Sequence, residues 1–141
     1  MASFEIAARF DAPAEKVWGF VSWDGMPVLT KGGFFTRAEF PAGPQIAPGA
    51  LRRVHLPEGP PFVERLEEIV PKDFYYRYRL VDTGALPITD YTGIVRVTPA
   101  GSGCCLKFGH CCTLLEGDAA SWFQAWSAIE QQVFDFIRRS L

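Results

Sequence analysis

The sequence has no excess of positive charge and no long uninterrupted apolar run. Its 141 residues include 14 Lys and Arg against 16 Asp and Glu, a formal net charge of −2. Nucleic acids and anionic membranes need clustered basic residues, so neither is expected as a partner. No segment reaches the roughly 18–20 uncharged apolar residues of a membrane span. Charged residues at Glu5, Arg9 and Asp11 interrupt the apolar core that a signal peptide needs. We therefore predict a soluble, cytoplasmic protein without an integral membrane segment.

The sequence also lacks internal repeats, low-complexity tracts and a glycine-rich phosphate loop. Its 11 prolines and 13 glycines are spread along the chain, which indicates many turns within one compact unit. We therefore predict a single domain over residues 1–141. The 12 Phe, 4 Trp and 4 Tyr exceed the needs of a small core. They indicate either a very large core or a cavity lined by aromatic rings.

The beginning of the chain predicts one strand followed by two short helices. The segment "SFEIAARF" alternates apolar and polar residues, as a half-buried strand does. A helix is expected in "DAPAEKVWGFVS", with Asp11 as its N-cap and Pro13 in its first turn. The next segment, "WDGMPVLTKGG", is predicted to be a broken helix or a turn, because Gly25 and Pro27 interrupt it.

From Phe34 onward the chain is predicted to be all-β for about eighty residues. Short turns rich in proline and glycine separate the segments, which indicates antiparallel connections. The predicted strands are "GFFTRAEF", "GALRRVHL", "FVERLEEIV", "DFYYRYRLV", "ITDYTGIVRVTP" and "GCCLKFGHCC".

The last segment changes from strand to helix periodicity. Asp118 is the expected N-cap of a helix of about 22 residues, which would span about 33 Å. The apolar stripe of this helix is formed by Trp122, Trp126, Ile129, Val133 and Ile137. A strand, two short helices, a meander of strands and a long terminal helix define an α+β fold in which the sheet grips the helix.

The chain resembles the START-like, helix-grip (SRPBCC) superfamily, in particular its polyketide cyclase/dehydrase and lipid-transport branch. The resemblance covers essentially the whole chain. It is carried by "FDAPAEKVWGFVS", "GALRRVHLPEGPPFVERLEE", "LPITDY" and the closing amphipathic helix.

The resemblance implies a curved antiparallel sheet of about seven strands wrapped around the long C-terminal helix, with a cavity between them. Members of this superfamily bind lipids, sterols, quinones or polyketides, and some are enzymes. Their motifs mark the family and not a reaction, so no catalytic residues carry over. A tryptophan expected in the last strand is missing, and Phe108 stands in its place.

All four cysteines lie in the last predicted strand. Cys104 and Cys112 share one face but would lie about 26 Å apart at about 3.3 Å per residue. Cys105 and Cys111 share the opposite face. Zinc requires thiolates at about 2.3 Å from one ion. We therefore expect these cysteines to be small hydrophobic side chains, and we predict neither a metal site nor a cofactor.

His110, Arg52 and Glu64 are the candidate polar groups of the cavity. His110 has the parity of Leu106 and Phe108, which places it on the inward face. It is either an acid–base group of the cavity or a neutral core histidine whose hydrogen bonds are satisfied by a neighbour. For the other two, the turn "PEGPP" is expected to pair Leu56 with Phe62, which makes Arg52 and Glu64 diagonal neighbours on one face. If that face is inward, they form a buried ion pair that is either structural or ligand-orienting.

Several aromatic residues complete the candidate site. Each of them either lines the cavity or belongs to the packed core. The predicted ligand cavity consists of Arg52, Glu64, Tyr76, Tyr78, Tyr91, Phe108, His110, Trp122 and Trp126.

These observations support three alternative functions. The first is binding of a hydrophobic small molecule, such as a lipid, sterol, quinone or polyketide-like compound, between the sheet and the terminal helix. The second is a cyclase- or dehydratase-like enzyme without metal, in which His110 works with a tyrosine or glutamate as acid and base. The third is an interaction module with a filled core. Whether a reaction is catalysed, which ligand binds and the oligomeric state stay open.

Overall fold

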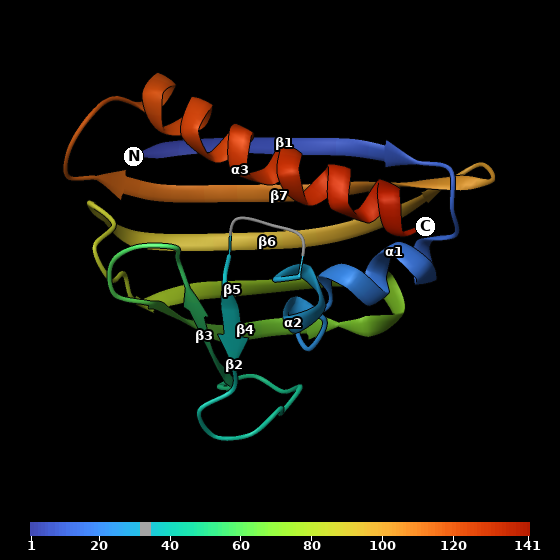
Figure 1. Cartoon of the computed structure of the whole chain (residues 1–141), viewed down its shortest axis with the longest axis horizontal. Helices are drawn as coiled ribbons and strands as arrows, with labels where there is room; N and C mark the ends of the chain where they lie inside the picture. The colour runs from blue at the N-terminus through green and yellow to red at the C-terminus, as the bar shows by residue number, and fades with distance from the viewer. Residues whose placement is uncertain (32–34) are drawn as a thin grey trace.

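A computed structural model describes residues 1–31 and 35–141 of the chain (Figure 1). One seven-stranded antiparallel sheet, in the order β1-β7-β6-β5-β4-β3-β2, carries the helices on one of its faces. The elements are β1 (Ala2–Phe10), α1 (Ala14–Val21), α2 (Met26–Leu29), β2 (Arg37–Glu39), β3 (Leu51–His55), β4 (Phe62–Val70), η1 (Pro71–Asp73), β5 (Tyr75–Asp82), β6 (Ile88–Ala100), β7 (Gly103–Leu114) and α3 (Ala119–Ser140).

The predicted α+β class is confirmed. Seven strands, two short helices after the first strand and a long terminal helix are all present. Asp118 caps α3 as expected, because its carboxylate accepts a hydrogen bond from the backbone N–H of Ser121. No helix in the described part of the chain is long and apolar enough to cross a membrane.

The expected N-cap of the first helix is wrong. The helix α1 begins at Ala14, and Pro13 occupies its N-cap position. Asp11 lies too early to cap the helix, and its side chain is 99% exposed. The physical reason is Pro13, because the residue before a proline is driven out of the helical region of backbone space. Ala12 is therefore not available as the first residue of a helix.

The second predicted strand is shorter than expected. Only Arg37–Glu39 forms β2, and it pairs with β3 at the edge of the sheet. The first two residues of the predicted segment, Gly33 and Phe34, lie outside the described residues.

The core lies between the sheet and the helices α1, α2 and α3. Phe134 of α3 has no exposed surface. Its ring stacks on that of Phe108 of β7, with a centroid distance of 5.6 Å, and meets the edge of Phe10 of β1 at 6.1 Å. These contacts fix the helix across the sheet at the end opposite to its N-terminus.

The four cysteines follow the strand β7 and do not converge. Cys104 pairs with Phe10 and Cys112 with Ala2, at opposite ends of β1. Both are fully buried, while Cys105 and Cys111 are half-buried. Within residues 1–31 and 35–141, no group of three or more His, Cys, Asp or Glu side chains is arranged to hold a metal ion.

Candidate functional site

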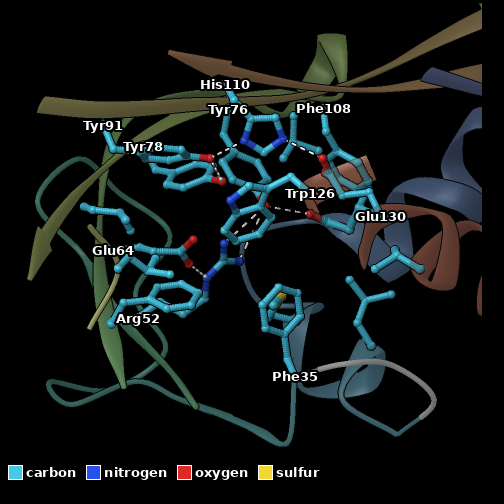
Figure 2. Close-up of a pocket in the computed structure, with 18 residues that line it drawn as sticks. Phe35, Arg52, Glu64, Tyr76, Tyr78, Tyr91, Phe108, His110, Trp126 and Glu130 are labelled. Atoms are coloured by element: carbon cyan, nitrogen blue, oxygen red, sulfur yellow. Dashed lines mark hydrogen bonds and ion pairs between the residues drawn. The ribbon is translucent and has the colours of Figure 1, made fainter. Parts of the chain in front are cut away.

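A cavity of about 70 Å³ lies on the helix-bearing face of the sheet (Figure 2). Residues from every strand from β3 to β7 line it, together with residues of α1, α2 and α3. All of the predicted cavity residues except Trp122 are found there: Arg52, Glu64, Tyr76, Tyr78, Tyr91, Phe108, His110 and Trp126.

Trp122 lies one helical turn before Trp126 and outside the cavity lining. Their ring centroids are 5.4 Å apart. The ring of Trp122 packs instead on a small buried cluster formed by Ile88, Tyr91 and Cys112. Trp122 therefore supports the side chains behind the cavity.

Arg52 and Glu64 face each other directly across β3 and β4. The observed register pairs Arg52 with Glu64 and Val54 with Phe62, so the expected pairing of Leu56 with Phe62 is wrong by two residues. The loop between the strands is longer than a tight turn, because its three prolines have no N–H groups with which to join the ladder. A slip of two residues preserves the face of every side chain, so the predicted common face is correct and it points inward.

Arg52 is held by several groups inside the protein. Its Nε donates to Glu64 Oε1 at 2.6 Å, and its Nη1 donates to the backbone carbonyl of Trp23 at 2.9 Å. Its guanidinium lies 4.2 Å from the centre of the Trp23 ring. The Arg52 and Glu64 side chains are only 3% and 6% exposed. Burial acts against the Arg52 charge, but the Glu64 carboxylate and Tyr76 outweigh it and keep the pKa of Arg52 above its ordinary value.

A second polar group forms a hydrogen-bonded chain of four side chains (Figure 2). The Tyr78 and Tyr91 hydroxyls are 3.1 Å apart. The Tyr91 hydroxyl is 2.5 Å from His110 Nδ1, and His110 Nε2 is 2.5 Å from Glu130 Oε1. These four hydrogen-bonded side chains therefore extend across the cavity lining from β5 through β6 and β7 to α3.

Burial affects the protonation of Glu130 and of the two tyrosines in this group. Desolvation raises the pKa of Glu130 above its ordinary value, although the hydrogen bond and the charge interaction with His110 act in the opposite direction. Desolvation also raises the pKa of Tyr78 and of Tyr91 well above the usual tyrosine value. Both tyrosines are therefore neutral hydroxyls near neutral pH.

A β-bulge directs Tyr91 into this arrangement. The pairing of β6 with β7 shifts by one residue between Thr89 and Thr92, and Asp90 adopts a left-handed backbone with φ of 54°. The extra residue lets Ile88 and Tyr91, three positions apart, both face inward. The bulge thus brings the Tyr91 hydroxyl to His110.

Glu130 is the site residue that sequence reasoning missed. Its side chain is 8% exposed and carries the only carboxylate that contacts His110 among the interactions of the described residues. The available signal was helix phase, since Glu130 follows Trp126 by one turn and lies on the same face. The predicted stripe used Ile129, which is only half-buried.

The absence of a side chain at Gly93 leaves room for the Tyr78 ring. The two residues pair across β5 and β6, and Gly93 also pairs with His110 across β6 and β7. A Cβ atom at position 93 would lie 2.3 Å from Tyr78 Cζ. Only glycine allows this close approach of the ring to the backbone.

We expect Gly93→Ala to displace the Tyr78 ring and to lower the free energy of unfolding by about 1–3 kcal/mol through overpacking. Urea denaturation measures the stability loss, and the chemical shifts of the Tyr78 ring report its displacement. Gly109→Ala is the matched control. Its Cβ atom would lie 2.5 Å from Ile94 Cγ1, and neither residue lines the cavity. Unchanged Tyr78 signals in Gly93→Ala would contradict the proposed role of the glycine.

Comparison with known proteins identifies related sequences and folds. A family model described as "Polyketide cyclase / dehydrase and lipid transport" matches residues 1–130. No curated protein matches the chain. The structure of the protein XoxI from Bacillus cereus is 18% identical, with a TM-score of 0.84, and the match covers 99% of this chain and 95% of that chain. An uncharacterized protein from Bacillus thuringiensis is 16% identical, with a TM-score of 0.79, and the match covers 99% and 98% of the two chains. At such low identity the two structures show a shared fold alone.

Proposed function

The chain belongs to the polyketide cyclase/dehydrase and lipid transport family, and from this membership we propose that it binds a hydrophobic small molecule in the cavity between the sheet and α3. The observation that carries the proposal is the chemistry of the lining. Aromatic and aliphatic side chains make up most of it, and a few buried polar groups face into it. Ligand sites are typically apolar with a small number of placed polar groups. Lipids, sterols, quinones and polyketide-like compounds are the candidate ligands.

The size of the cavity means that binding requires rearrangement. Its volume is about 70 Å³, less than half of the roughly 150 Å³ that accommodates benzene in an engineered protein cavity. Trp126 of α3 lines the cavity and is only half-buried, so rotation of its ring would enlarge the space without unfolding the sheet.

Ligand binding is tested with protein purified from its own source. Native mass spectrometry should detect a co-purifying apolar molecule. A panel of sterols, fatty acids and aromatic polyketides should contain a compound that raises the melting temperature by roughly 5–10 °C at a concentration about 100 times its Kd. If no ligand co-purifies and no compound shifts the melting temperature, the binding proposal fails.

Acid–base catalysis on the bound molecule is the second candidate function. The observation that favours it is the position of His110 between a phenol and a carboxylate, the arrangement that orients a histidine for proton transfer. A cyclase or dehydratase would change the ligand, so a dehydrated product would differ from the substrate by the mass of one water. His110→Ala should abolish this change while binding persists.

The third alternative, an interaction module with a filled core, is disfavoured by the cavity and its polar lining. We also propose a cytoplasmic location, in which the four free cysteines stay reduced.

A further inference from the structure

The guanidinium in the cavity lining already has a carboxylate partner. Arg52 is paired with Glu64 at 2.6 Å. The other titratable side chains of the lining are Tyr76, the neutral tyrosines Tyr78 and Tyr91, and the pair of His110 with Glu130. A carboxylate ligand would add an unbalanced negative charge beside a guanidinium that already has its partner, and burying such a charge is costly. The cavity therefore favours an uncharged ligand.

The hydrogen-bonded chain can run in two directions that differ by one proton. With Glu130 ionised and His110 neutral, His110 Nε2–H donates to Glu130, and Nδ1 accepts from the Tyr91 hydroxyl. Tyr91 then accepts from Tyr78, so the Tyr78 oxygen offers only lone pairs to the cavity.

One additional proton from water reverses the donor–acceptor direction of these hydrogen bonds. Whether that proton resides on Glu130 or on His110, Nδ1 of His110 carries a hydrogen and donates it to the Tyr91 oxygen. Tyr91 then donates to Tyr78, and the hydrogen of the Tyr78 hydroxyl is released toward the cavity. The proton count of the His110–Glu130 pair thus decides whether Tyr78 is a donor or an acceptor.

The surroundings favour the state with the additional proton. In that state the His110–Glu130 pair has no net charge, whereas without the proton it carries a buried negative charge. The raised pKa of Glu130 acts in the same direction.

The titratable groups that line the described part of the cavity with this pair are Tyr91 of β6, Tyr78 and Tyr76 of β5, Glu64 of β4 and Arg52 of β3. Arg52 and Glu64 are charged, and they pair with each other at 2.6 Å. On the side of β1, the apolar ring of Phe4 stacks on His110 with a centroid distance of 4.8 Å.

We infer that the cavity selects an uncharged, largely apolar ligand with a carbonyl oxygen, which accepts a hydrogen bond from the Tyr78 hydroxyl while the His110–Glu130 pair holds the additional proton. This inference rests on the proposed binding function and names the ligand class. It distinguishes ketones and quinones from hydrocarbons, from fatty-acid anions and from alcohols that act as donors.

The proton-dependent reversal is tested first without any ligand. ¹⁵N NMR of His110, in a chain with only two histidines, should show a protonated Nδ1 at low pH that becomes unprotonated as the pair loses its proton. Glu130→Gln removes the titrating carboxylate. The change at His110 Nδ1 that accompanies loss of the Glu130 proton should therefore disappear. A Nδ1 that is unprotonated from about pH 5 to about pH 9 would overturn the inference.

Ligand selection is tested with 1-indanone and indane, which share a skeleton and differ by the carbonyl. We expect 1-indanone to bind roughly 5–10-fold more tightly, the value of one hydrogen bond, as measured by calorimetry. This advantage should decrease as the pH rises and the pair loses its proton, and Glu130→Gln should flatten that dependence.

Tyr78→Phe should remove the advantage of 1-indanone, while Tyr75→Phe on the outer face of the same strand should preserve it. Equal affinity for both probes in the wild-type protein would overturn the inference and leave the binding function intact. If neither probe binds and the ligand panel shifts no melting temperature, both the inference and the proposed function fail.

Discussion

Arg52→Met is expected to lower the free energy of unfolding by about 3–5 kcal/mol, because it leaves Glu64 as a buried carboxylate without its partner. The Glu64 side chain is 6% exposed, and its contact with Arg52 is 2.6 Å long. The backbone carbonyl of Trp23 also loses its donor. Urea denaturation at neutral pH measures the loss.

Two further variants separate the ion pair from a general effect of substitution. Adding Glu64→Leu to Arg52→Met removes the stranded carboxylate and should restore most of the lost stability. Arg53→Met is the matched control at the neighbouring position, since Arg53 is 38% exposed and pairs with Glu39. Its loss should stay within about 1 kcal/mol. A small effect of Arg52→Met alone would show that Glu64 does not depend on this partner.

Phe134→Ala should cost about 3–5 kcal/mol, because it removes a fully buried ring from the contact between α3 and the sheet. The ring stacks on Phe108, which also lines the cavity. Loss of the ring therefore weakens the attachment of the helix that carries Glu130 and Trp126. Thermal and urea unfolding monitored by circular dichroism measure this effect.

Phe123→Ala is the control on the same helix. Phe123 is 41% exposed, so its loss should cost much less than that of Phe134. Phe134→Leu keeps an apolar side chain in the core and should fall between the two. Similar losses for Phe123→Ala and Phe134→Ala would contradict the view that Phe134 anchors α3.

The fold could be predicted because its signals are local. Strand alternation, turn residues and the stripe of α3 are properties of neighbouring residues in the sequence. Parity placed His110 on the inward face, and it placed Arg52 and Glu64 on one common face whose direction the sequence left open. This prediction survived the wrong register of β3 and β4, because a shift of two residues leaves every side chain on its original face.

The arrangement of the site could not be predicted because it depends on tertiary contacts. Glu130 lies twenty positions from His110, and a search for apolar stripes passes over a charged residue on the buried face of a helix. The bulge at Asp90 depends on how β6 meets β7. A single extra residue of this kind leaves no periodic signal in the sequence.

The pairing of β1 with β7 also has a consequence for synthesis on the ribosome. Ala2 pairs with Cys112, so β1 has no partner strand until about 100 further residues follow. At about 5–20 residues per second, this interval is roughly 5–20 s. The helix α3, which supplies Glu130 and Phe134, emerges later still. A nascent chain stalled before α3 therefore exposes the aromatic face of the sheet and lacks the α3 side chains of the cavity, Trp126, Glu130 and Val133.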